Sequence, residues 1–518
     1  MSSNRIHTRN LAFNWGGHAA TLVVMFFLSP YIVGKLDAVS YGIWSLLTVL
    51  TGYMGIFDLG ARASVGRHVA LYLGKGDEEG VDETIRAGFG FFTLTGGLIL
   101  IVGVLLGWLF PTLFQSVPQE HYGTVRYLLP LMVVNIWVAA ISAIYSSVLA
   151  AHDRFDIARG IDLVVLFVRT VATIYALYRG WGLWGLAGAI IIGNVVSVIG
   201  NRIYAGKIQS GLRSFPLLYS KKRLKEIFGY GFAAFISTAA VKIIGQSDLV
   251  IVGILLSVAE VREYSVGAML IYYSATFVSI ISRTFFPAVQ RTVSSGKMEE
   301  VKQLLIRQLH VSLCFGLLVY VGFVFYANSF IELWMLQDGF DQHAVALSAG
   351  VMTILALSKF PTLYIYPFQS VLAAMGYVRF NAQLAVLEAI TNVLFSLFFV
   401  LVLNWGLLGV AAGTLAARLI VPSFWTPYYL CRKAMMSGQS FTLLVIMPGC
   451  LATGLFSLVC FLQITLWPPV TWSLFGLHII LAIFFWAVIA SLLLIPKEMR
   501  QQLVASLRNQ MMKISVFG

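Results

Sequence analysis

The sequence predicts an all-α polytopic membrane protein with 14 transmembrane helices: two six-helix lobes related by a pseudo-two-fold axis along the membrane normal, plus two C-terminal helices. Three observations lead to this fold class: the composition, the length of the apolar runs and an internal repeat. Of the 518 residues, 59% are hydrophobic and only 11% charged, with a mean hydropathy of +0.85. Water-soluble domains carry about 25% charged residues, so this composition indicates a membrane protein.

Fourteen apolar runs are long enough to cross a bilayer as helices, since about 20 helical residues span a hydrocarbon core of roughly 30 Å. The runs are continuous rather than alternating, which favours helices over the strands of an outer-membrane barrel. Their expected limits are 11–34, 41–66, 86–110, 126–150, 158–178, 183–205, 226–255, 264–290, 306–327, 343–374, 383–403, 407–430, 440–464 and 471–495.

The basic residues orient these helices, because Lys and Arg near the ends of spans are retained on the cytoplasmic side. With the N-terminus inside, 27 of the 35 Lys and Arg residues fall on cytoplasmic ends and loops, and four on the opposite side. We therefore expect a multi-pass protein with both termini in the cytoplasm. The basic residues are spread over many short loops, so we expect membrane lipids rather than nucleic acid as partners.

Motifs for nucleotide binding, metal binding and catalysis are missing from the sequence. The four cysteines lie in or beside spans without CxxC spacing, which predicts neither disulfides nor a metal site. No GxxxxGK[ST] or HExxH motif occurs, and "GWGLWG" at 180–185 lies between two apolar helices with no strand before it. We therefore expect no enzyme activity, no cofactor and no metal.

Internal repetition predicts the two lobes. "SVLAA" at 147–151 recurs at 370–374, and an Arg-Phe pair closely follows each copy. "WGLWGLAGA" from Trp181 matches "WGLLGVAAG" from Trp405, and "GKGDEE" at 74–79 pairs loosely with "GKMEE" at 296–300. Three matches in the same order at nearly one spacing indicate a duplicated unit of six spans. An even number of spans inserts both copies the same way up, which predicts an axis along the membrane normal.

The repeat divides the chain into four regions. We expect an N-terminal lobe over 1–205, a basic cytoplasmic linker over 206–225, a C-terminal lobe over 226–432, and two added spans with a cytoplasmic tail over 433–518. Transporters built from such repeats commonly bind their substrate between the repeats and rock one against the other. Alternating access of this kind is the expected mechanism.

With these motifs the sequence resembles the Wzx-like polysaccharide flippases of the multidrug/oligosaccharidyl-lipid/polysaccharide (MOP) exporter superfamily. The resemblance is carried by "FDLGARASVGRHVALYLGKGDEE" (57–79) and by both copies of the WGLxG turn, and it covers roughly residues 10–430. It implies a flippase of the bacterial cytoplasmic (inner) membrane. Its implied substrate is an undecaprenyl-pyrophosphate-linked oligosaccharide, moved from the cytoplasmic to the periplasmic leaflet for export of O-antigen, capsule or exopolysaccharide. A polysaccharide polymerase and glycosyltransferases are implied partners.

Three other functions stay open. A lipid II-type flippase also has fourteen spans. A multidrug or metabolite cation-coupled antiporter would be expected to have an acidic, aromatic-rich cavity, whereas the charges that stand out within the spans here are basic. A scaffold that recruits glycosyltransferases would leave the charges inside the spans unexplained.

Four basic residues lie inside the predicted spans: Arg169, Lys242, Lys359 and Arg418. A basic residue at mid-membrane costs about 2.5–3.5 kcal/mol on insertion scales, so we expect these side chains to face a cavity rather than lipid. We expect them to form, with Arg62 at the cavity mouth, a cationic substrate-binding surface with few acidic partners. Three of the four lie in the second lobe.

The repeat relates two of these basic residues to amides. At the spacing of the repeat, Lys359 and Arg418 correspond to Asn135 and Asn194, respectively. The second lobe is therefore expected to be the more cationic.

Acidic residues within the spans are candidates for ion coupling or charge balance. Asp58 lies four residues before Arg62, so the two either pair on one helix or act at the cavity mouth. Lys242 and Asp248 are six residues apart, about 240° around a helix, so each needs a partner elsewhere. For Lys242 the alternatives are a salt bridge, for example with Asp58, and contact with a pyrophosphate or acidic sugar.

Asp162 and Glu388 occupy similar positions near the inner ends of the fifth and eleventh spans. Each could exchange a proton during transport, or simply pair with a basic residue such as Arg159 or Arg169. We expect that the two are not jointly required as a proton site.

Overall fold

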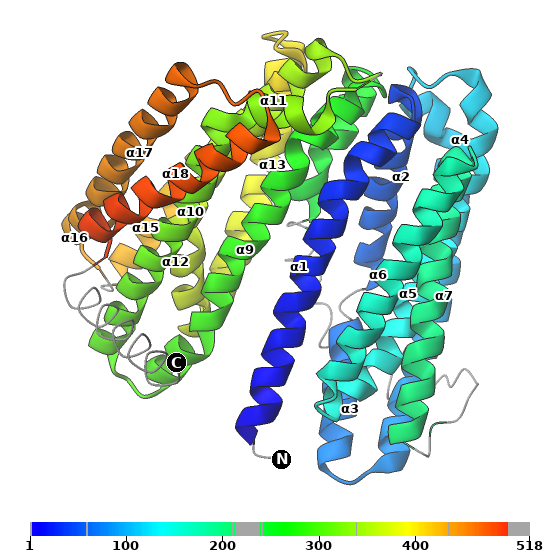
Figure 1. Cartoon of the computed structure of the whole chain (residues 1–518). Coiled ribbons are helices and arrows are strands. Elements are labelled where there is room, and N and C mark those ends of the chain that lie inside the picture. Colours follow the sequence, from blue (N-terminus) through cyan, green and yellow to red (C-terminus); the bar gives the residue numbers. More distant parts are fainter. Residues whose placement is uncertain are drawn as a thin grey trace, which may run out of the picture. The chain divides into compact units, whose positions relative to one another are not determined.

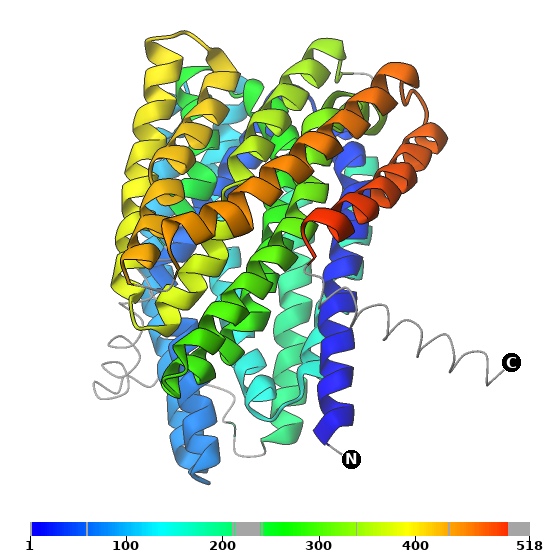
Figure 2. The same ribbon diagram turned by 90° about the vertical axis from the view of Figure 1, so that its left-hand side faces the viewer.

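The structure is a computed structural model, and it is built from helices (Figures 1 and 2). No strand occurs among the residues that it describes, where the pairing of Gln337 with Phe340 is an isolated bridge. The predicted all-α class is therefore confirmed. The described residues are 3–58, 61–209, 212, 239, 242–337, 339–433 and 436–495.

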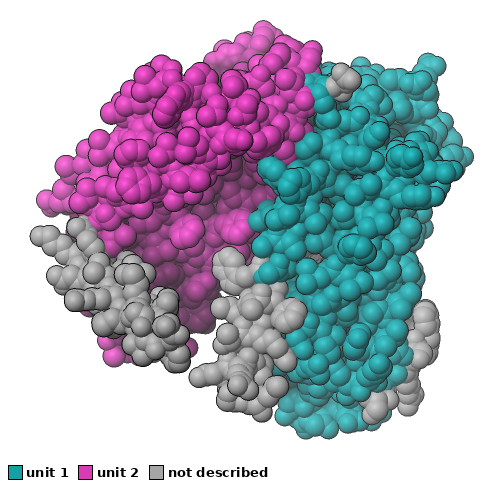
Figure 3. Space-filling view, in the orientation of Figure 1, with its two compact units in different colours: residues 1–262, 337–340 teal, residues 263–336, 341–518 magenta. Residues whose placement is uncertain are grey.

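The chain divides into two compact units, coloured separately in Figure 3. Unit 1 comprises residues 1–262 and 337–340, and unit 2 comprises residues 263–336 and 341–518. Most of the predicted linker over 206–225 and the C-terminal tail lie outside the described residues. The four predicted regions stay a prediction.

Unit 1 contains the helices of the first half of the chain. Asp37 and Asp77 cap two of them, each side-chain oxygen accepting a hydrogen bond from a backbone N–H three residues later. The helices are α1 (Ser3–Lys35), α2 (Ala38–Met54), η1 (Gly55–Asp58), α3 (Ala61–Gly74), α4 (Glu78–Leu113), η2 (Gln119–His121), α5 (Tyr122–Ala151), α6 (Phe155–Tyr178), α7 (Gly182–Ile208) and a helical segment at 242–255.

Unit 2 contains one long helix, α10 (Met298–Met335), whose buried face joins a hydrophobic core cluster of this unit. The final two helices pack on it: Trp486 Nε1 donates to the carbonyl of Cys314, and Tyr326 Oη donates to Gln463 Oε1. The other helices are α9 (Glu260–Ser294), α11 (Gln342–Lys359), α12 (Thr362–Ala374), α13 (Val378–Leu401), α14 (Gly406–Ile420), α15 (Pro422–Arg432), α16 (Gly438–Phe441), the π-helical turn η3 (Thr442–Ile446), α17 (Met447–Leu466) and α18 (Trp472–Leu493).

Ten of the described helices are long and apolar enough to cross a membrane, and the bent pair α11–α12 makes an eleventh if it counts as one span. These eleven coincide with eleven predicted runs. Of the other three, the run at 11–34 lies within α1 (Ser3–Lys35), and the run at 41–66 begins with the shorter apolar helix Ala38–Met54. The run at 226–255 is described mainly from residue 242 onward.

Two predicted spans differ from the helices observed. The run at 41–66 is not one helix, because α2 ends at Met54 and Gly55 forms its C-cap. The run at 343–374 is bent by 40° between α11 and α12. Pro361 explains this bend, since it has no N–H to donate and its ring would clash with the carbonyl of Leu357 one turn earlier.

The repeated WGLxG turns share an unusual backbone conformation. In the first copy Gly180 and Gly182 have φ angles of 73° and 50°, and in the second copy Asn404 and Gly406 have 56° and 54°. Glycine and asparagine adopt positive φ more readily than other residues, and each turn places one such residue on either side of its tryptophan. Each turn joins two helices that pack directly against each other, α6 with α7 and α13 with α14.

The other two repeated motifs also end in turns of positive φ. Asp153 and Gly376, which follow the two copies of "SVLAA", have φ angles of 57° and 89°. In the loosely matched pair the turn glycines are Gly76 and Gly296, whereas the sequence match aligns Gly74 with Gly296. The backbone thus supports the repeat and corrects the register of its weakest motif.

Candidate functional site

Lys242 of unit 1 is half-buried on the helical segment 242–255. Its Nζ donates to the backbone carbonyl of Gly52 on α2, 3.0 Å away. Gln246 of the same helical segment also approaches Gly52, since a Cβ there would lie 2.7 Å from its side-chain oxygen. Asp58, one partner expected for Lys242, has its side chain outside the described part of the structure.

Arg62 lies close enough to Lys242 for the two positive charges to interact. Arg62 also lines a small cavity between α2, α4 and α5, together with Thr95 and Trp137. Asp248 is fully buried and interacts electrostatically with Tyr53 of α2. The structure therefore brings two of the predicted basic residues together in unit 1.

The charged residues of α6 lie at its surface or against α7. Asp162 accepts a hydrogen bond from Arg159 at 3.0 Å, and both side chains are largely exposed. This is the pairing expected as the alternative to proton exchange. Arg169 is half-buried, and its Cβ faces Gly193 of α7. A substrate contact for Arg169 stays a prediction.

Lys359 of unit 2 is buried in the last turn of α11, directly before the break at Pro361. Its Nζ lies 5.6 Å from the centre of the Tyr272 ring of α9, which is within the range of a cation–π interaction. A positive charge at this end of a helix also complements the partial negative charge of its last carbonyl groups. Both effects stabilise a cation at this depth.

Arg418 and Glu388 form a buried ion pair in unit 2. Arg418 Nη2 lies 2.7 Å from Glu388 Oε1, and the two side chains are 9% and 8% exposed. The expectation that the basic residues within the spans have few acidic partners is therefore wrong for Arg418. Its charge is balanced by α13, and its substrate contact stays a prediction.

Further polar contacts join the same two helices. Asn392 donates to Thr414 at 2.7 Å, and Ser396 donates to the carbonyl of Val410. Leu403, next to the WGLxG turn, lies midway in sequence between Glu388 and Arg418. It also lies midway between the partners of the other two contacts. The repeated turn therefore contained a signal for this pairing that the sequence analysis did not use.

In unit 1 the counterparts of Lys359 and Arg418 contact each other directly. Asn194 Nδ2 donates to Asn135 Oδ1 at 2.7 Å between α7 and α5. Two neutral amides satisfy each other there. At the same two repeat positions unit 2 carries two positive charges, one of which is held by Glu388.

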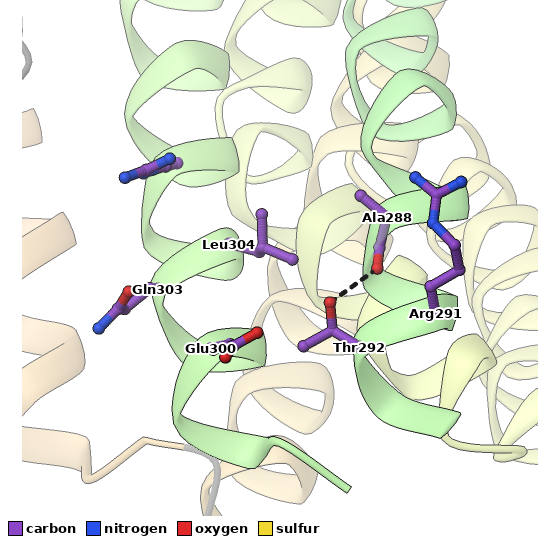
Figure 4. Close-up of a pocket in the computed structure, with 7 residues that line it drawn as sticks. Ala288, Arg291, Thr292, Glu300, Gln303 and Leu304 are labelled. Carbon is purple, nitrogen blue, oxygen red and sulfur yellow. Dashed lines mark hydrogen bonds between the residues drawn. The ribbon is translucent and has the colours of Figure 1, made fainter. Parts of the chain in front are cut away.

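A cavity of about 380 Å³ lies between α9 and α10, near the turn that connects them (Figure 4). Thr292 of α9 and Glu300 and Leu304 of α10 face one another across it in this view. Arg291 and Arg307 also line it, while Glu300 is paired with Lys297 at 2.9 Å. This cavity was not predicted, because its residues lie in and beside the loop between two predicted spans, where the basic residues indicated only the topology.

The long apolar helices, with charged residues buried among them, define a polytopic membrane protein. A family model described as "Polysaccharide biosynthesis protein" matches residues 78–341, and the chain belongs to this family. The predicted Wzx-like membership of the MOP superfamily is thereby confirmed.

Individual relatives agree with this assignment. A Shigella flexneri protein, provisionally named as an O-antigen transporter, is 20% identical over 409 residues, which are 78% of this chain and 93% of that protein. The lipid II flippase MurJ, in an inward closed conformation, is 16% identical with a TM-score of 0.69 and covers 92% of this chain and 98% of its own. An inward-facing multidrug resistance MATE transporter of the MOP superfamily is 12% identical with a TM-score of 0.60, covering 80% and 96%. These relatives are transporters and flippases, not enzymes.

Proposed function

We propose that the protein is a flippase that moves an undecaprenyl-diphosphate-linked oligosaccharide from the cytoplasmic to the periplasmic leaflet by alternating access. The proposal includes fourteen spans in two six-helix lobes with a pseudo-two-fold axis along the membrane normal, and both termini in the cytoplasm of a bacterium. Glycosyltransferases would supply its substrate and a polysaccharide polymerase would consume its product. The family and the Shigella relative support polysaccharide export as the process.

The observation that carries this proposal is the pair of lysines within the spans, Lys242 and Lys359. A carbonyl oxygen holds the first and an aromatic ring contacts the second. Each lysine brings one positive charge into an apolar helix. A diphosphate entering a poorly solvated site needs such charges, and hydrogen bonds to charged groups contribute about 1.5–3 kcal/mol each. Unit 1 carries one such cation at Lys242 and unit 2 another at Lys359.

The first test is polymer export in a strain that lacks its own flippase. Lys242→Gln and Lys359→Gln should each reduce export by roughly tenfold or more, because each removes a charge-assisted hydrogen bond. Lys→Arg exchanges should be milder but not silent, since the two groups bind phosphate differently. Membrane protein levels must stay normal. Arg179→Gln, which changes an exposed arginine outside the spans, is the matched control and should leave export unchanged.

Arg418 needs a separate variant because of its buried partner. Arg418→Gln alone would leave Glu388 as an unpaired charge, so the informative protein carries Glu388→Gln as well. If Arg418 also binds substrate, this neutral double variant will be well folded and defective in export. Full export by the combined Lys242→Gln, Lys359→Gln, Arg418→Gln, Glu388→Gln variant would overturn the cationic mechanism.

A further inference from the structure

The loop between α10 and α11 contains a short turn that belongs to a different unit from the two helices it connects. Residues 337–340 belong to unit 1, whereas Leu336 before them and Asp341 after them belong to unit 2. Consecutive elements usually lie next to each other, so a connecting loop is expected to pack with the helices it joins. Contacts particular to this turn must therefore hold it on unit 1.

The turn itself is compact. The backbone N–H of Phe340 donates to the carbonyl of Gln337 at 2.9 Å, which closes a four-residue β-turn. Gly339, its third residue, has a φ of 85°, which glycine adopts readily and which a type II turn requires at this position. Leu336 alone separates the turn from the end of α10, and Asp341, directly after it, is the N-cap of α11. The turn is thus joined to both helices without a long spacer.

Arg262, at the start of α9, holds one end of the turn. Phe340 is fully buried, and the guanidinium of Arg262 lies 5.0 Å from the centre of its ring. Arg262 Nη1 also donates to the carbonyl of Gly339. Hydrogen bonds from charged donors are stronger than neutral ones, and a cation over an aromatic ring adds to the attraction. Charge and burial therefore act together at this end.

Gln337 joins the other end of the turn to α1. Its Nε2 donates to the carbonyl of Pro30 at 2.9 Å. Gly34, one helical turn later on α1, lies against the same side chain, and a Cβ there would collide with the Gln337 side-chain oxygen. The glycine leaves room for the glutamine to lie along α1. Both ends of the turn therefore contact unit 1.

The predicted topology places all of these residues on the same side of the membrane. The outer ends of the first, seventh and ninth predicted spans fall near residues 34, 255 and 327. Lys35 and Arg262 are two of the four basic residues expected outside. The end of α1, Arg262 and the turn therefore meet on the periplasmic side in this topology. The charge distribution that predicts it is independent of these contacts.

We propose that the turn at 337–340 is a periplasmic latch of the transport cycle. Docked on α1 and Arg262, it ties the outer ends of α10 and α11 to unit 1 and keeps the periplasmic side closed. Opening to the periplasm requires the turn to leave unit 1 together with its two helices. The inference rests on the proposed function, because it needs a transporter that works by alternating access.

The test is a reversible crosslink between positions 34 and 337. Gly34→Cys and Gln337→Cys are combined in a full-length protein whose four native cysteines are replaced by alanine. The Cδ of Gln337 lies 2.8 Å from where a Cβ at position 34 would be, so a short thiol crosslinker that reductant cleaves spans the two positions. Export of newly made polymer is followed in a strain that lacks its own flippase. Export should be lost in proportion to the fraction crosslinked, and reductant should restore it.

A second cysteine pair is the matched control. Gln342 Nε2 donates to Glu332 Oε1 at 2.9 Å, and both residues belong to unit 2 on either side of the turn. Crosslinking of Glu332→Cys to Gln342→Cys should leave export unchanged, because this link does not involve unit 1. Full export with complete crosslinking between 34 and 337 would overturn the latch, and so would equal loss in the control pair. Wild-type protein that cannot restore export to the strain would instead overturn the proposed function.

Arg262→Gln tests the docked state without locking it. This change removes the charged donor to Gly339 and the cation over Phe340. The pair at 34 and 337 should therefore crosslink more slowly, while the pair at 332 and 342 keeps its rate. Arg262→Lys keeps the charge and should lie between Arg262→Gln and the parent protein. An unchanged rate at 34 and 337 in Arg262→Gln would contradict docking through Arg262.

Discussion

At the scale of single residues, the depth of a charged pair decides what it contributes. Arg418 and Glu388 are buried with their charges 2.7 Å apart, whereas Arg159 and Asp162 are paired at 3.0 Å on an exposed helix surface. Buried pairs are often no more stable than apolar replacements, but loss of one partner leaves an uncompensated charge. Exposed pairs contribute little, because water screens them.

This contrast gives a prediction about stability. Arg418→Gln and Glu388→Gln should each destabilise the protein strongly, by about 3–5 kcal/mol if the remaining charge stays ionised. The double variant should recover most of that loss. The corresponding changes at Arg159 and Asp162 should cost about 1 kcal/mol or less, singly or together. Thermal unfolding in detergent, followed by fluorescence, measures the difference, and additive effects at Arg418 and Glu388 would contradict the pairing.

At the scale of helices, close backbone approach depends on particular glycines. Gly42 of α2 faces the backbone carbonyl of Val258, and any Cβ at position 42 would collide with that oxygen. A backbone atom cannot rotate away as the end of a side chain can. Gly97 of α4 has open space where its Cβ would be, although it too lies within a helix.

Gly42→Ala and Gly97→Ala should therefore have opposite effects. The first should push α2 away from residue 258 and lower the thermal stability and the membrane level of the protein. The second should be neutral or stabilising by up to about 1 kcal/mol, because alanine is the better helix former. Both are measured as protein level and midpoint of thermal unfolding. A Gly42→Ala protein as stable as the wild type would show that this contact is not formed as described.

Helix boundaries show what hydropathy can and cannot predict. Eleven apolar runs coincide with observed spans because a run of about 20 apolar residues has few alternatives in a membrane. Hydropathy takes no account of backbone hydrogen bonding. It therefore did not predict the end of α2 at Met54 or the break after Lys359. Pro361 was a visible signal for that break.

The candidate site was predictable to a similar extent. A charge within an apolar run is conspicuous in the sequence, so Lys242, Lys359 and Arg418 could be named without a structure. Their partners could not be named from composition, since the Gly52 carbonyl and the Tyr272 ring are contributed by other helices.

At the scale of the whole molecule, the orientation in the membrane follows from the distribution of basic residues, which predicts that both termini and the loop at 206–225 are cytoplasmic. Reporter fusions test this directly: a phosphatase active only in the periplasm and a fluorescent protein active only in the cytoplasm, fused in turn after Lys222 and after Gly518. Cytoplasmic signals are expected at both positions, and a periplasmic signal is expected after Arg179 as the control for an outward turn. A periplasmic signal after Lys222 would require an odd number of spans before that residue, and the six-plus-six duplication would then be wrong.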